Sequence, residues 1–110
     1  MPRAKPLSPI SADPERAGHL ADVLKAVAHP LRIRIVAILC QGEQHVTALA
    51  NRVGVSQAVV SQQLRILRGH GLVRASRRGG FSRYRLVEPN LRELVRCVER
   101  CGDGRSQRAA

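Results

Sequence analysis

The segment 46–73 reads VTALANRVGVSQAVVSQQLRILRGHGLV, and its pattern limits the fold of the chain more than any other feature. Apolar residues recur at helical spacing before Gly54 and again after Ser56. Gly54 suits a turn, and Ser56 suits the N-cap of a second, longer helix, which Gly71 is placed to end. The segment therefore predicts a short helix, a glycine turn and a longer helix.

An alternating pattern replaces the helical one after Gly71. The runs LVRASRR and FSRYRLV lie on either side of Gly79 and Gly80. A glycine pair between two such runs indicates a β-hairpin, because tight hairpin turns need residues with positive φ. A short helix, a longer helix and a hairpin in this order predict a winged helix-turn-helix, in which the hairpin is the wing.

Three more helices are predicted around this unit. The first starts at Asp13, the second at His29-Pro30 and the last after Glu88-Pro89-Asn90, where polar caps and prolines suit a first turn. Their apolar stripes are Leu20, Val23, Leu24 and Val27, then Leu31, Ile35, Ile38 and Leu39, and finally Leu91, Leu94, Val95 and Val98. Because only 2% of the residues are aromatic, the core must be aliphatic, which favours stacked helices. The predicted fold class is mainly α with a small β-hairpin: about five helices plus a two-stranded wing.

The chain of 110 residues is the size of one domain, which we place at residues 13–102. Residues 1–12 are predicted to form a disordered basic arm and residues 103–110 a flexible tail. The apolar runs fall short of the roughly 20 residues that cross a bilayer, and the N-terminal residues lack the apolar segment of a secretory signal. We therefore expect a cytoplasmic protein without a membrane partner.

The charge of the chain indicates a polyanionic partner. The formal net charge is +11, and a surplus of this size repels itself unless a negatively charged partner shares the surface. Nucleic acid is the first candidate for such a partner. Arginines gather in the predicted wing, at Arg74, Arg77, Arg78, Arg83 and Arg85, and Arg65 and Arg68 extend the basic surface along the longer helix. We expect the wing to grip the backbone or the minor groove of DNA.

The outer face of the longer helix is neutral instead of charged. Gln57, Ser61 and Gln62 are expected opposite the apolar stripe of Val60, Leu64 and Leu67. Amides and hydroxyls both donate and accept hydrogen bonds, so they suit base edges in the major groove. The candidate DNA-binding residues are Ser56, Gln57, Ser61, Gln62, Arg65, Arg74, Arg77, Arg78 and Arg83.

Other classes of function fit the sequence less well. An enzyme is not expected, because the sequence has no paired carboxylates, nucleophile motif or phosphate-binding glycine loop. An architectural or RNA-binding winged-helix protein with inert cysteines is one alternative, and a constitutive regulator without an inducer is another. Protection of a short palindrome, absent on scrambled DNA, separates a regulator from an architectural protein.

The chain resembles the ArsR/SmtB family of bacterial repressors. The resemblance covers about residues 18–101 and is carried by Ala28-His29-Pro30-Leu31-Arg32, by the segment 46–73 and by Tyr84-Arg85-Leu86 at the end of the hairpin. It implies a homodimeric repressor whose first and last helices form the interface. The dimer would bind double-stranded operator DNA at an imperfect palindrome and leave when an inducer binds.

Two sensing sites of the family have no match in this chain. Arsenic sensors place cysteines in the third helix, which here reads VTALANRVG, and zinc sensors place Asp and His pairs on the last helix, which here reads EPNLRELVRCVERC. Some thiol-switch repressors of the family use one cysteine in the second helix and one in the last. Relative to that pattern, Cys40 lies about one turn later and Cys101 slightly earlier.

The remaining candidates for sensing are Cys40, Cys97 and Cys101, which are expected to be reduced in the cytosol. Cys97 and Cys101 are four residues apart, on one face of the last helix, and Cys40 faces them if the second and last helices are antiparallel. One chemistry is a bridge formed by a persulfide or an oxidant, helped by Arg96 and Arg100, which favour thiolates.

The other chemistry is binding of arsenite, antimonite or a heavy metal by three converging thiolates. Such a thiophilic ion, acting as the inducer, is the one cofactor we consider. We expect DNA binding itself to require no cofactor. Cys40 could instead be a small buried apolar residue. Between the two chemistries, the thiol switch is preferred.

Overall fold

Polar caps begin the first two helices as the sequence predicts. The computed structural model describes residues 9–87 and 90–101. Helix α1 (Pro14–Val27) begins after Asp13, whose carboxylate accepts a hydrogen bond from the Arg16 amide at 3.0 Å. Helix α2 (Pro30–Leu39) begins after His29, whose Nδ1 accepts a hydrogen bond from the Leu31 amide at 3.2 Å.

The predicted helix-turn-helix is confirmed. Helix α3 (Val46–Val53) ends at Gly54, whose φ of 75° lies in the left-handed region. Helix α4 (Gln57–Gly69) follows, and the Ser56 hydroxyl oxygen accepts a hydrogen bond from the Val59 amide at 3.2 Å. The serine cap and the glycine turn thus separate the two helices at the expected positions.

The wing is a hairpin inside a three-stranded sheet. Strands β2 (Val73–Arg78) and β3 (Phe81–Leu86) are antiparallel, and the turn between them contains Gly79 and Gly80, both with positive φ. The prediction missed strand β1 (Gln44–His45), which pairs with β3 and gives the order β1-β3-β2. Two residues are too few to show an alternating pattern, so tertiary pairing alone reveals this strand.

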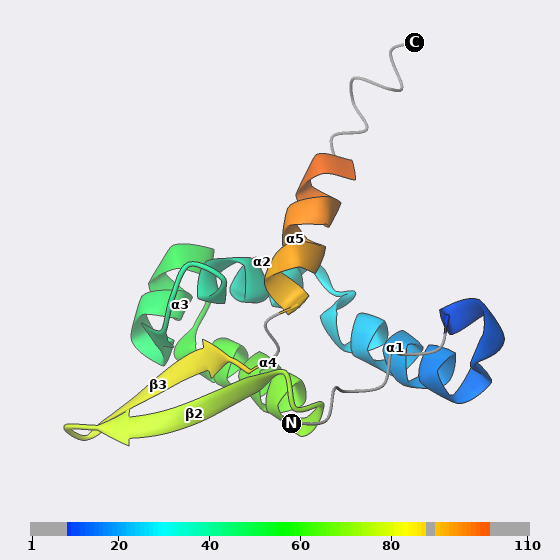
Figure 1. Ribbon diagram of the computed structural model, residues 1–110. Coiled ribbons are helices and arrows are strands. Elements are labelled where there is room, and N and C mark those ends of the chain that lie inside the picture. Colours follow the sequence, from blue (N-terminus) through cyan, green and yellow to red (C-terminus); the bar gives the residue numbers. More distant parts are fainter. Residues whose placement is uncertain (1–8, 88–89, 102–110) are drawn as a thin grey trace, which may run out of the picture.

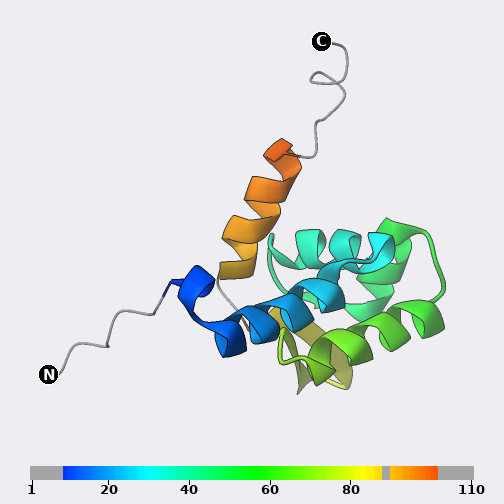
Figure 2. The same cartoon turned by 90° about the vertical axis from the view of Figure 1, so that its right-hand side faces the viewer.

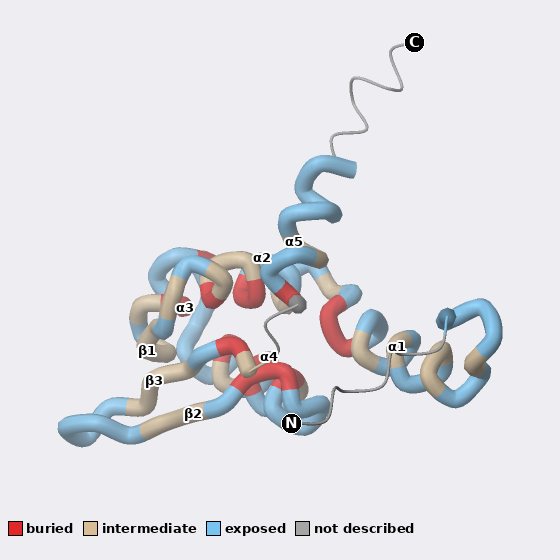
Figure 3. The backbone as a smooth tube through the Cα atoms, viewed as in Figure 1, coloured by how far each residue is buried: buried red, intermediate tan, exposed pale blue. Residues whose placement is uncertain are grey.

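Helix α2 lies at the centre of an aliphatic core. It packs against α1, α3, α4, β3 and α5 (Asn90–Cys101), and Ile35 and Val36 are fully buried. Val36 was not in the predicted stripe, whereas Leu31 and Ile38, which were, are only partly buried. The difference arises because neighbours cover α2 on several sides and not along one stripe. Figure 3 shows the buried residues concentrated where α2, α3 and α4 meet the base of the wing.

Helices α1 and α5 extend beyond this core. Figure 1 shows the wing at one end of the molecule, α1 at the opposite end and α5 standing away from both, and in Figure 2 α5 again rises away from the other helices. Val27 and Leu91 are buried, but Leu24 is 50% exposed and Val98 is 48% exposed. The apolar stripes of these two helices therefore fill the core only in part.

The predicted tail lies outside the described residues, as do Glu88 and Pro89 at the predicted start of the last helix. The predicted arm, residues 1–12, is described only from Pro9, and Ile10–Ala12 form a single 3-10 turn, labelled η1, before α1. Among the described helices, none is long and apolar enough to cross a bilayer.

Leu64→Ala is expected to destabilise the protein by about 2–5 kcal/mol, because Leu64 is fully buried and truncation leaves a cavity below α4. Chemical denaturation followed by circular dichroism measures this change. Gln62→Ala, on the exposed side of the same helix, is the matched control and should change stability by less than about 0.5 kcal/mol. Equal losses from the two variants would contradict the assigned faces of α4.

Candidate DNA interface and thiol sites

Helix α4 presents a neutral polar face outward. Gln57 and Gln62 are exposed and Ser61 is half-buried, while Val60, Leu64 and Leu67 on the inner side are fully buried. The hydroxyl oxygen of Ser56 accepts the capping hydrogen bond at the start of the helix, which leaves its O–H donor and one lone pair for other partners. The exposed amides are therefore free to meet a partner's polar groups, and Ser56 lies at the N-terminal end of the same helix.

A third amide of α4 is used inside the protein. The Gln63 side-chain oxygen accepts a hydrogen bond from Nη1 of Arg32 in α2, with 3.1 Å between the two atoms. Nη1 of Arg34 donates to the Val53 carbonyl, the last of α3, at 3.2 Å. Nothing in the sequence pattern identifies the acceptors of these two arginines.

The arginines of the wing are divided between its two faces. Opposite residues of a hairpin point to the same side, and successive pairs alternate. Val73 and Leu86 form a buried pair, so the next pair, Arg74 and Arg85, points to the other face. That outer face carries Arg74, Arg78, Arg83 and Arg85, and Arg77 lies on the opposite one. The prediction grouped Arg77 with Arg78, but strand alternation separates them.

The outer face of the wing is electrostatically unbalanced. Arg74 lies directly opposite Arg85, and like charges in this position repel each other. Among the described residues, no carboxylate pairs with any of the four outer-face guanidinium groups, whereas on α5 Arg96 pairs with Glu93 at 3.6 Å. A polyanion such as the DNA backbone would relieve this repulsion.

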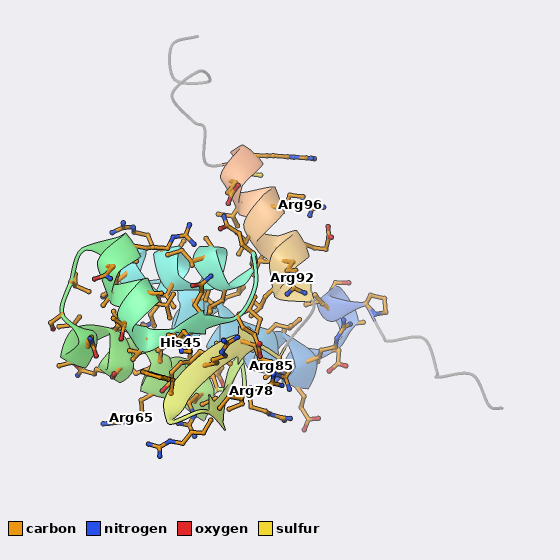
Figure 4. The ribbon with its side chains drawn as sticks, turned by 90° about the vertical axis from the view of Figure 1, so that its left-hand side faces the viewer. His45, Arg65, Arg78, Arg85, Arg92 and Arg96 are labelled. Atoms are coloured by element: carbon orange, nitrogen blue, oxygen red, sulfur yellow. The ribbon has the colours of Figure 1, made fainter. Side chains whose placement is uncertain are left out.

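The wing and α4 share one side of the molecule. Figure 4 shows Arg65 of α4 together with Arg78 and Arg85 of the wing in the lower part of the view, and Arg92 and Arg96 on α5 in the upper part. Strand β1 supports the wing near its turn, where the His45 and Phe81 rings have centroids 5.6 Å apart in an edge-to-face arrangement. Helix α4 contacts strand β2 directly, so the neutral helix and the cationic hairpin lie next to each other.

The three cysteines do not converge within one protomer. Cys40, at the end of α2, lines a surface cavity of about 210 Å³ together with Arg92, Val95 and Glu99 of α5. Cys97 and Cys101 lie on another flank of α5, exposed to solvent. The expectation that Cys40 faces the pair is therefore not met, because α5 turns its Arg92 side toward the end of α2.

The same geometry counts against a three-thiolate metal site. Across residues 9–87 and 90–101, no three Cys, His, Asp or Glu side chains come close enough to bind one ion. Arg92 reinforces the packing that separates the thiols, because its Nε donates to the Cys40 carbonyl at 3.1 Å. Only Cys97 and Cys101 remain as neighbouring thiols.

The electrostatics of the thiols also differ from the expectation. Burial raises the pKa of the Cys40 thiol, and the charge of Arg92 opposes this only in part. The pKa of Cys101 is raised as well, first by its hydrogen bond with Cys97 and then by the charge of that neighbour. We expected Arg96 and Arg100 to favour the thiolate, but at Cys101 the adjacent sulfur dominates.

Comparison with known proteins gives a consistent result. Residues 29–75 match the family described as bacterial regulatory protein, arsR family. The biofilm growth-associated repressor of Xylella fastidiosa strain Temecula1 is 37% identical over 84 residues, which cover 76% of this chain and 74% of that protein. Such relatives are transcriptional regulators and not enzymes, as the sequence predicts.

Solved structures with the same fold match most of the chain. The crystal structure of the transcriptional repressor BigR from Xylella fastidiosa has a TM-score of 0.76 and 34% identity, with 83% of this chain and 93% of that chain covered. The homodimeric winged helix-turn-helix domain of Mb0332 from Mycobacterium bovis has a TM-score of 0.74 and 30% identity, with 93% of each chain covered. With its helix-turn-helix, its wing and these relatives, the chain belongs to the arsR family of bacterial regulatory proteins.

Proposed function

We propose that the protein is a homodimeric transcriptional repressor that reads an imperfect palindrome in operator DNA. The observation that carries this proposal is the exposed amide face of α4 beside a wing face with four arginines that pair with no described carboxylate. Amides suit base edges, and guanidinium groups suit the flanking phosphates. Relatives named as repressors support the direction of regulation.

The homodimer is proposed to form through α1 and α5. A hollow of about 230 Å³ lies between these helices and the start of α2, and its apolar lining includes Leu24, Ile33, Leu94 and Val98. Leu24, Ile33 and Val98 are between 40% and 50% exposed in the single chain, and burying them stabilises an interface. The Mb0332 domain, which matches 93% of this chain, is described as homodimeric. Two recognition helices would then address half-sites about one helical turn apart.

Replacing the two exposed amides, Gln57→Ala with Gln62→Ala, is expected to reduce the preference for operator over scrambled DNA. Removing each base contact should cost about 1–3 kcal/mol at its position, while binding to scrambled DNA stays unchanged. Mobility-shift titrations with both duplexes measure the two affinities. Equal weakening on both duplexes would mean that the amides do not read sequence.

Replacing the opposed pair, Arg74→Ala with Arg85→Ala, is expected to weaken binding on every duplex. The slope of log K against log salt should decrease by roughly 0.9 for each phosphate that is no longer neutralised. Thermal stability should not fall, because the change removes a repulsion between neighbouring strands. An unchanged salt slope would remove the outer wing face from the DNA interface.

Release from DNA is proposed to follow a thiol-directed signal at Cys97 and Cys101. A persulfide RSSH transfers sulfur to one thiol and leaves as RSH; the second thiol then attacks the inner sulfur of the new persulfide, forms a disulfide and releases hydrogen sulfide. Residues four apart on a helix have Cβ atoms about 5–6 Å apart, whereas a disulfide requires about 3.5–4.5 Å. Closing the bridge would therefore distort the end of α5 around Val98, which lies at the proposed dimer interface.

A thiophilic ion at the same pair is the second candidate signal. One arsenic, antimony or heavy-metal atom between the two sulfurs spans the helical spacing with less distortion than a disulfide. Cys40 would take no part within one protomer, because it faces the Arg92 side of α5. Either bridge needs to change operator affinity by only a few kcal/mol to empty the site.

The variant Cys97→Ser with Cys101→Ser is expected to bind the operator and ignore the inducer. Cys40→Ser is the matched control and should still be released, because Cys40 lies away from the pair. Mobility shifts after treatment with a persulfide donor or arsenite measure release, and intact-protein mass spectrometry distinguishes a disulfide from a bound ion. Release of the double variant, or loss of release in the Cys40 variant, would contradict this assignment.

A further inference from the structure

We propose that Arg32 is a positioning residue for DNA recognition: it fixes the orientation of α4 through Gln63 and so sets sequence discrimination without contacting DNA. This inference rests on the proposed reading of DNA by α4. The contact joins residues 31 positions apart, with 3.1 Å between Nη1 of Arg32 and Oε1 of Gln63. Arg32 is half-buried, and its Nε is buried without a hydrogen-bond partner among the described residues.

The inner face of α4 is held by packing, through the fully buried Val60, Leu64 and Leu67. A hydrogen bond adds a directional constraint that aliphatic contacts do not supply. Among the hydrogen bonds of the described residues, the one from Arg32 to Gln63 alone joins a side chain of α4 to another helix. Gln62 is the neighbour of Gln63, so the constraint on Gln63 also helps to set where the exposed amide of Gln62 lies.

The helix that carries Arg32 is firmly anchored in the core. Arg32 lies in the first turn of α2, and that helix is anchored by Ile35 and Val36, both fully buried. Arg34, two residues further along α2, donates a hydrogen bond from Nη1 to the carbonyl of Val53 at 3.2 Å. Val53 directly precedes the Gly54 turn. The two arginines thus hold the two helices of the helix-turn-helix on either side of its turn.

The Arg32 guanidinium differs from those of the exposed wing arginines Arg74, Arg78 and Arg85. Arg32 is half-buried and directs Nη1 at Gln63. Its Nε is buried like that of Arg83 in the wing, so the hydrogen bond to Gln63 is what sets Arg32 apart. Removing Arg32 should therefore change where the amides of α4 lie and not how many phosphates are neutralised.

The test compares Arg32→Met, Gln63→Met and the double variant with the wild-type full-length chain. The probes are a duplex selected from a random library by the wild-type protein and a scrambled duplex of equal composition, each titrated at several salt concentrations. Each single variant should lower the operator-to-scrambled affinity ratio about tenfold, and the double variant should lose no more than either single one. Affinity for scrambled DNA and the salt slope should stay at the wild-type values.

Lys25→Met, which removes an exposed charge from α1, is the control and should retain the wild-type ratio. If Arg32→Met does not fold, Gln63→Met is compared with Arg32→Lys: losses in both support positioning, and a loss in Gln63→Met alone does not. Arg32→Lys keeps the charge and one donor and should restore part of the discrimination.

Three outcomes would overturn the inference alone, and a fourth would overturn the proposed function with it. A smaller salt slope in Arg32→Met would make Arg32 a phosphate contact. Loss of discrimination in Gln63→Met alone would make Gln63 a base contact. Wild-type discrimination in every variant would leave Arg32 without a role in positioning, while the proposed function would stand. A wild-type protein that selects no sequence at all would overturn both.

Discussion

The burial of α2 is the interaction on which the rest of the molecule depends. Ile35 and Val36 are fully buried between four other helices and β3, so α2 cannot shift without opening the core. Its first half carries Arg32 and Arg34, which donate hydrogen bonds to α4 and α3, and the carbonyl of Cys40 at its end accepts the hydrogen bond from Arg92 of α5. The proposed DNA-reading side and the thiol-bearing helix are therefore attached to opposite ends of one rigid element, roughly 15 Å long.

The proposed recognition surface divides its chemistry between two elements. Helix α4 is neutral on its exposed face, which suits discrimination, and the outer wing face is cationic, which suits affinity. The repulsion between Arg74 and Arg85 shows that this face is not arranged for the stability of the free protein. Its arrangement makes sense when a phosphate backbone lies across it. The contact between α4 and β2 keeps the wing close to the helix that carries the amides.

Local rules made most of the fold predictable from the sequence. Ser56 and Asp13 cap helices, and Gly54, Gly79 and Gly80 turn the chain, because these roles depend on a residue and its immediate neighbours. The features that were missed depend on distant partners: β1 needs β3, Gln63 needs Arg32, and the facing of Cys40 needs the crossing of α5 over α2. The spacing of Cys97 and Cys101 placed them together, but no spacing rule relates either to Cys40.

The central claim is that two copies of α4 enter successive major grooves while the wings grip the strands beside them. Chemical footprinting of the protein on its selected duplex, with probes for both grooves, tests this claim most directly. The account predicts two patches of major-groove protection about one helical turn apart, with backbone protection flanking them, and no such pattern on scrambled DNA. Uniform protection of both duplexes, or a single patch without symmetry, would contradict it.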